Sequence, residues 1–157
     1  MTKKINKQIL RNTILRLTSI VSALLIFAVV LTGCGNKLTE ADVSYAGPMA
    51  ENVLTAIEDN NYDQFSKDFS DKMKNTLTKE NFEAMVELFD SKIGEYQGKS
   101  FAGAANTKED GKILTVIVYQ AEYSREPKGV QITVSFSGNN DQKIIEGLFF
   151  NSPNLAK

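Results

Sequence analysis

The spacing of apolar residues changes once along this chain, near Gly94. Before that residue, apolar side chains recur every three or four positions, as on the buried stripe of a helix. After it they alternate with polar ones, as on a strand with one buried face. Helices followed by a run of strands are typical of an α+β domain with an antiparallel sheet. The pattern therefore predicts helices first and a strand meander second.

Three helices are predicted between residues 46 and 93. The first begins near Pro48, which suits a first helical turn, and its stripe includes Met49, Val53 and Ile57. The second has a stripe of Tyr62, Phe65, Phe69, Met73 and Leu77. Whether this helix is continuous or is broken near Ser70 is left open by the pattern. The third has Thr78 as its N-cap and a stripe of Phe82, Met85, Val86, Phe89 and Ile93.

Four strands are predicted after Gly94, at residues 96–105, 113–123, 130–136 and 144–150. Asp110-Gly111 is a hairpin signal, and residues 138–141 form a second polar turn. Short turns join consecutive strands in antiparallel order. The sequence thus predicts an α+β domain with three N-terminal helices on a four-stranded antiparallel sheet.

An export signal is predicted at the start of the chain. Five basic residues precede an apolar stretch that ends in Leu31-Thr32-Gly33-Cys34. This tetrad resembles the lipobox of bacterial-type lipoproteins, in which cleavage between Gly33 and Cys34 leaves a diacylglyceryl-modified cysteine. The resemblance implies a signal peptide over 1–33, a lipidated cysteine and tether over 34–45, and a domain over 46–157. It places that domain at the cell membrane or envelope, lipid-anchored on the extracytoplasmic face.

Two alternatives for this segment remain. An uncleaved membrane anchor needs about 20 apolar residues, and this run is shorter. A secreted soluble protein would need small residues at both the last and third-last positions before cleavage, which Leu31 does not supply. Lipidation at Cys34 is therefore the favoured prediction, because two acyl chains anchor a protein stably.

The charge of the mature chain limits its partners. Five of the 18 basic residues but none of the 19 acidic residues lie in residues 1–33, which leaves a net charge of −6. An acidic domain is repelled by phosphates, so no nucleic-acid partner is expected. With one cysteine there is no intramolecular disulfide, and stability must come from a hydrophobic core.

Two segments carry a resemblance to a known family. Residues 61–74, Asn-Tyr-Asp-Gln-Phe-Ser-Lys-Asp-Phe-Ser-Asp-Lys-Met-Lys, and the later Gly94-Glu95-Tyr96 resemble the uncharacterised DUF3887 family. The resemblance covers roughly residues 46–150 and implies an NTF2-like or cystatin-like cone, in which helices pack across a strongly curved sheet. It implies no activity, since the family is named for an unknown function.

The residue types exclude several chemistries. The chain has no histidine, and its single cysteine is the predicted lipid site, so Ser-His-Asp triads, Cys-His pairs and histidine-based metal sites are absent. No cofactor and no metal site are predicted. An acid/base site made of a carboxylate and a tyrosine hydrogen-bond donor is the chemistry that these residue types still allow. The candidate pocket residues are Tyr62, Tyr96, Tyr119, Tyr123, Phe136, Glu122 and Glu146.

Each candidate also has a purely structural interpretation. Tyr119 and Tyr123 share one side of a predicted strand and are typical cross-strand packing residues. Glu122 and Glu146 are expected to face solvent, although either could point inward at a strand end. A buried carboxylate beside a tyrosine would favour function.

The predicted function is non-catalytic binding of a small apolar ligand by the concave sheet of a membrane-anchored domain. One alternative is a protein-interaction module of an envelope complex, or a homodimer formed through the open sheet face. Another is an isomerase- or dehydratase-like acid/base enzyme without histidine.

Overall fold

The computed structural model describes residues 37–139 and 142–157. Gly33 and Cys34, on which the lipoprotein prediction rests, lie outside the described residues. Gly35–Lys157 forms one compact unit. Within the described ranges, no helix is both long enough and apolar enough to cross a membrane.

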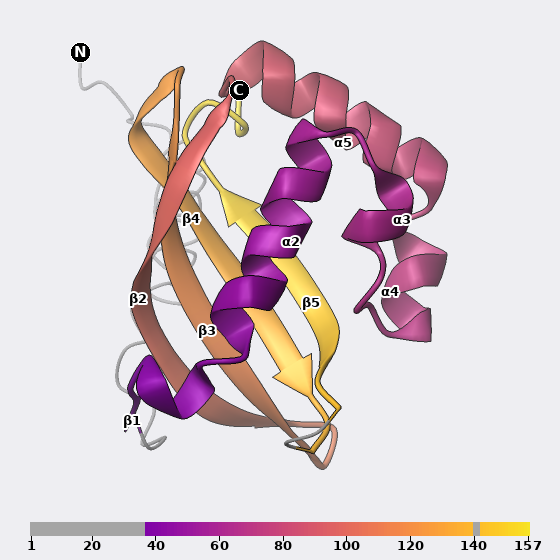
Figure 1. Cartoon of the computed structure of the whole chain (residues 1–157), viewed down its shortest axis with the longest axis vertical. Helices are drawn as coiled ribbons and strands as arrows, with labels where there is room; N and C mark the ends of the chain where they lie inside the picture. The colour runs from indigo at the N-terminus through magenta and orange to yellow at the C-terminus, as the bar shows by residue number, and fades with distance from the viewer. Residues whose placement is uncertain (1–36, 140–141) are drawn as a thin grey trace, which may run out of the picture. The chain divides into compact units, whose positions relative to one another are not determined.

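Helices precede most of the strands, as Figure 1 shows. The helices are η2 (Ala41–Val43, a short 3-10 helix), α2 (Ala46–Glu58), α3 (Tyr62–Phe65), α4 (Asp71–Thr76) and α5 (Lys79–Lys92). The strands are β1 (Lys37–Leu38), β2 (Tyr96–Glu109), β3 (Lys112–Tyr123), β4 (Glu126–Ser137) and β5 (Ile144–Asn151). This order confirms the α+β prediction.

The sheet has five antiparallel strands rather than the four predicted, in the order β1-β2-β3-β4-β5. The additional strand is β1, in which Lys37 pairs with Ala105 and Leu38 with Ala104. An edge strand offers unpaired backbone groups, and two residues are enough to occupy part of the edge of β2. So short a strand has no alternation that a sequence pattern could reveal.

The predicted second helix is in fact two short helices, α3 and α4. The chain between them ends at Ser70, near which the sequence analysis had left a break open. Ser70 is the N-cap of α4, and its hydroxyl accepts a hydrogen bond from the Met73 amide at 3.3 Å. The chain before α4 pairs with β5, since the Ile145 amide donates to the Asp68 carbonyl and the Ser70 amide to the Ile145 carbonyl. The described domain therefore has four α-helices, because the edge of β5 competes for the same backbone groups.

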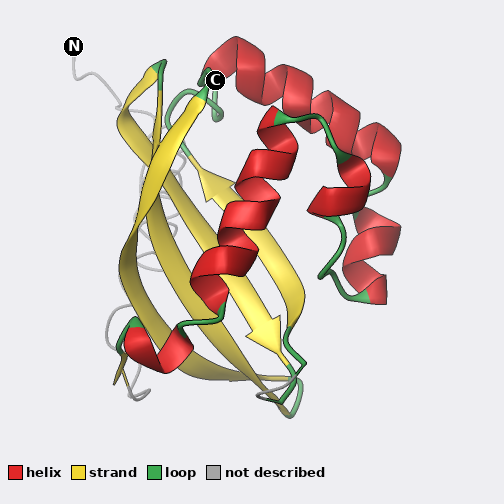
Figure 2. Cartoon of the chain, viewed as in Figure 1, coloured by secondary structure: helices red, strands yellow, loops and turns green. Residues whose placement is uncertain are grey.

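The core lies between the helices and one face of the sheet. Figure 2 shows α2 running across that face, with α3, α4 and α5 grouped beside it. The buried side chains of β4 are Val130, Ile132, Val134 and Phe136, which confirms the predicted alternation. Register shifts interrupt every pairing among β2, β3, β4 and β5, and such bulges bend strands, as the curved ribbons of Figure 1 show.

The turn between β3 and β4 is bonded to two other parts of the chain. The Ser124 and Arg125 amides donate to the carbonyls of Glu95 and Ile93, in the turn between α5 and β2, at 2.9 and 2.8 Å. The buried carboxylate of Glu126 accepts hydrogen bonds from the C-terminal segment 152–157, through the Ser152 hydroxyl and the Asn154 amide. One end of the sheet is thus joined to α5 and to the C-terminus.

Candidate functional site

Three tyrosines lie on the helix-covered face of the sheet, at its α5 end and its middle. Tyr96 is on β2, and Tyr119 and Tyr123 are on β3, where each is at most 4% exposed. The ring centroids of Tyr96 and Tyr123 are 5.6 Å apart. Burial raises the pKa of Tyr119 to about 12 and raises the pKa of Tyr96 and Tyr123 as well. All three hydroxyls are therefore protonated at neutral pH.

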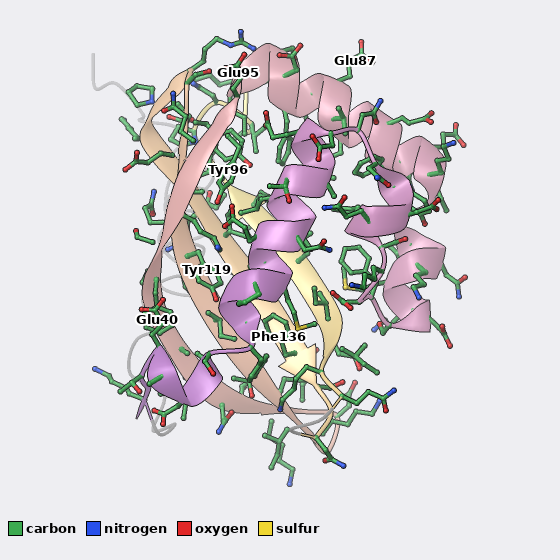
Figure 3. The ribbon with its side chains drawn as sticks, viewed as in Figure 1. Glu40, Glu87, Glu95, Tyr96, Tyr119 and Phe136 are labelled. Carbon is green, nitrogen blue, oxygen red and sulfur yellow. The ribbon has the colours of Figure 1, made fainter. Side chains whose placement is uncertain are left out.

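Glu51 on α2 contacts two polar side chains of β2, those of Tyr96 and Lys99. Its carboxylate accepts a hydrogen bond of 3.0 Å from the Tyr96 hydroxyl and forms an ion pair with Lys99 on β2. The Lys99 side chain is only 11% exposed, and its Nζ lies 5.4 Å from the centroid of the Tyr119 ring. The carboxylate and the ring face stabilise a cation that has lost most of its water. Figure 3 shows Tyr96 and Tyr119 along this part of the sheet.

A pocket of about 240 Å³ opens next to this cluster, where the C-terminal parts of α2 and α5 meet the start of β2. We call it the junction pocket; it is lined by Ile57, Glu58, Val86, Phe89, Asp90, Gly94 and Glu95. Three of these residues are apolar and three carry carboxylates. Figure 3 labels Glu95 at this end of the domain. Carboxylates are thus as numerous as apolar side chains here, whereas the usual small-ligand site is lined predominantly by apolar groups.

Gly94 lines the pocket at the point where the α5–β2 turn packs against the β3–β4 turn. Its φ is +79°, and a Cβ added to it would lie 2.2 Å from the Ser124 hydroxyl oxygen. That hydroxyl accepts a hydrogen bond from the Glu95 amide at 2.9 Å. A residue with a side chain would be strained here and would collide with the β3–β4 turn. The glycine therefore lets the two turns approach closely enough to hold Glu95 in place.

Tyr96 connects the junction pocket to the Glu51 cluster. Its backbone amide donates a hydrogen bond of 2.9 Å to the Glu58 carboxylate, while its hydroxyl bonds to Glu51. Glu51 and Glu58 are seven residues apart, so they share one side of α2. A single residue of β2 therefore positions two carboxylates of the helix.

Tyr123 carries a buried hydroxyl with no hydrogen-bond partner in the described part of the chain. Its ring meets Phe89 edge to face at 6.2 Å, and the charge of Glu58 adds to burial in raising its pKa. Phe89 and Glu58 both line the junction pocket. Tyr123 thus packs against the pocket lining through its ring but is not itself one of the lining residues.

The other predicted pocket residues lie elsewhere. The Tyr62 hydroxyl donates to the Leu77 carbonyl at 2.9 Å and joins α3 to the end of α4. Phe136 is a core residue that packs against Tyr45, with ring centroids 5.4 Å apart. Glu122 is exposed, on the face of the sheet away from the core.

Glu146 is partly buried and bonded within the sheet. Its carboxylate accepts a hydrogen bond of 2.7 Å from the Ser137 hydroxyl, which lowers its pKa. The structure thus brings together Tyr96, Tyr119 and Tyr123 of the seven predicted residues.

Four residues that the pattern did not single out belong to this region: Glu51, Glu58, Glu95 and Lys99. The one sequence signal that could have pointed to them was the seven-residue spacing of Glu51 and Glu58, which puts both on one side of a helix beside its apolar stripe. Across residues 37–139 and 142–157, no three acidic side chains lie close enough together to hold a metal ion. The junction pocket itself presents three apolar side chains and three carboxylates.

The domain is a small α+β protein, and its candidate site is the junction pocket. Residues 50–148 match a family model described as "Protein of unknown function (DUF3887)", which confirms the resemblance drawn from residues 61–74 and 94–96. Because the match spans more than half of the chain, the chain belongs to the DUF3887 family. A comparison with curated proteins finds no match.

Proposed function

We propose that this chain is a lipid-anchored extracytoplasmic protein whose domain binds a small, largely apolar ligand in the junction pocket, without chemistry. The observation that carries the proposal is the pocket itself, about 240 Å³ with Ile57, Val86 and Phe89 in its lining. This volume lies below the usual range for sites of drug-sized ligands, about 300 to 1,000 Å³, so the proposed ligand is small. An NTF2-like or cystatin-like cone is the proposed fold type.

A binding role fits the charges better than catalysis does. The one carboxylate bonded to a tyrosine hydroxyl among the described residues is Glu51, which is 46% exposed and paired with Lys99. A general base works best when it is desolvated and free to accept a proton. Glu51 meets neither condition, so the acid/base alternative has the weaker support.

The interaction-module alternative rests on a different observation. Phe149 on β5 is 63% exposed, and its cross-strand partner is Thr133, on the face of the sheet away from the core. A lone exposed aromatic is common on monomeric proteins. It is therefore a minor candidate beside a formed pocket.

Filling the pocket tests the proposal. Val86→Phe places a larger side chain in the pocket lining, and Ala84→Phe makes a similar addition at an exposed position of the same helix. The probe is a neutral aromatic dye such as N-phenylnaphthylamine, added to Gly35–Lys157 and followed by amide chemical shifts. We expect shifts at Gly94 and Glu95 that disappear in Val86→Phe and persist in Ala84→Phe. Shifts centred on Phe149 instead would support the interaction module.

The anchor is tested separately in cells. Cys34→Ser should abolish incorporation of a labelled fatty acid and release the protein from the membrane fraction. A Ser44→Ala variant, at an exposed position, is the control. Retention of the unlabelled Cys34→Ser protein in membranes would support an uncleaved anchor.

A further inference from the structure

The chain enters the domain along the edge of β2. Lys37 and Leu38, the two residues of β1, pair antiparallel with Ala105 and Ala104. Traced backwards from Leu38 to Lys37, the chain therefore runs toward the tip of the β2–β3 hairpin. Figure 1 shows β1 and this hairpin tip at one end of the domain and the α5–β2 turn at the other.

The predicted lipid anchor is close to this strand along the chain. Cys34 precedes Lys37 by three residues. Three residues of fully extended chain span at most about 11 Å. A diacylglyceryl group on Cys34 would hold its sulfur at the bilayer surface. Because Lys37 already pairs with Ala105 in the sheet, no long linker separates the sheet from that surface.

The described residues at this end of the sheet have balanced charges. The basic ones are Lys37, Lys108, Lys112 and Lys143, and the acidic ones are Glu40, Asp42, Glu109 and Asp110. The mature chain as a whole has a net charge of −6. Negative surfaces are repelled by anionic headgroups within a Debye length, about 8 Å in physiological salt. The described residues at this end add nothing to that repulsion, so the end can approach a bilayer.

The hairpin also presents an apolar side chain to the outside. Ile113, the second residue of β3, is 69% exposed, and its cross-strand partner is Lys108. Lysine stems can lie along lipid while their charges stay in water. One exposed isoleucine is common on a soluble protein, but this one lies at the end of the sheet to which the anchor leads.

We propose that the proximal end of the domain, made of β1, the β2–β3 hairpin and the β4–β5 turn, rests on the surface of a phospholipid bilayer, with Ile113 in the interfacial layer. This inference rests on the lipid anchor of the proposed function and adds the orientation of the domain. β2 has 14 residues, which is roughly 40 Å along the strand. The junction pocket, at the start of β2, would then lie far from the bilayer and meet ligands dissolved in water.

Paramagnetic lipids test this orientation. A chain of residues 34–157 is joined through the Cys34 thiol to a maleimide lipid, in a phospholipid nanodisc that also contains a gadolinium-chelating lipid. The gadolinium broadens the signals of amides near the bilayer. We expect the amide signals of Gly111 and Ile113 to be lost, and those of Gly94 and Ser124, in the turns at the other end, to be retained.

Variants test the contact and the short connection. Ile113→Glu should recover part of the Gly111 signal, because a carboxylate avoids the interfacial layer. Leu88→Glu, at a 41% exposed position of α5, is the matched control and should leave the pattern unchanged. A flexible Gly/Ser linker of about twelve residues inserted directly after Cys34 should also recover the Gly111 signal, whereas the same linker added after Lys157 should not.

The outcomes separate the orientation from the proposed function. Signal loss at both ends, at the Gly94 end alone or at neither end would show that the proposed orientation is wrong, while the anchor and the binding function stand. An unchanged pattern in Ile113→Glu would contradict the contact of Ile113 with lipid. The lipid is attached chemically here, so a failure of the anchor is seen separately, as Cys34→Ser protein that stays in the membrane fraction of cells, and it would remove the basis of the orientation.

Discussion

The hydroxyl of Tyr96 donates a hydrogen bond of 3.0 Å to the carboxylate of Glu51, which lies 45 residues earlier in the chain. The bond joins the first residue of β2 to the middle of α2, where Glu51 also pairs with Lys99. This contact links α2 to β2 beside the buried apolar stripe that packs α2 on the sheet.

Tyr96→Phe should lower the free energy of unfolding by about 1.5 kcal/mol, since it removes a hydrogen bond to a charged group in a partly buried place. The ring and its packing on Tyr123 remain. Urea unfolding followed by circular dichroism measures the change. A loss below about 0.3 kcal/mol would mean that Lys99 alone holds Glu51.

Tyr123→Phe should have the opposite effect on the free energy of unfolding. The substitution removes a buried hydroxyl that has no partner among the described residues, so it should raise the free energy of unfolding by about 1 kcal/mol. The same unfolding measurement compares it with Tyr96→Phe. A destabilised variant would show that the hydroxyl has a partner in solution, such as a bound water.

Gly94→Ala should lower the free energy of unfolding by about 2 kcal/mol or more, because Gly94 has a φ of +79° and its added Cβ would collide with Ser124. Gly47→Ala is the matched control. It lies in α2 with nothing within 4 Å of the added Cβ and should be neutral or stabilise by up to about 1 kcal/mol. Equal effects of the two substitutions would contradict the close approach of the turns.

Glu126 should make stability depend on pH in the acidic range. The hydrogen bond from the Ser152 hydroxyl holds its pKa below the ordinary value of 4.5. A carboxyl with a lowered pKa in the folded state stabilises fully above its unfolded pKa, and this contribution is lost as the pH falls through the folded value. Urea midpoints measured from neutral pH down to about pH 3 should therefore fall less steeply for Glu126→Gln than for the parent. Glu109→Gln, at an exposed position, should keep the parent slope.

The sequence pattern predicted what depends on local periodicity. Thr78 was expected to cap the third helix, and its hydroxyl does accept a hydrogen bond from the Asn81 amide at 3.4 Å. Tyr119 and Tyr123 were expected on one side of a strand, and both are buried. Features that depend on distant partners were not predicted, such as β1, whose two residues are a strand only because β2 presents a free edge.

The candidate site was less predictable than the fold for the same reason. Glu58 ends a helix and Glu95 precedes a strand, so neither stands out in its own segment. They line one pocket because α5 brings the chain back over the end of α2. Predicting that pocket would have required the packing of α5 in advance, which the spacing of apolar residues does not specify.

The two ends of the sheet tolerate change very differently. The β3–β4 turn at Ser124 and Arg125 fastens the α5–β2 turn, and the neighbouring Glu126 holds the C-terminal segment, so a cut there would loosen three parts of the chain at once. At the other end, Asp110 and Gly111 form an exposed hairpin tip between β2 and β3. That tip is therefore the natural place to insert an epitope or a fluorophore that reports on the protein in living cells without disturbing the junction pocket.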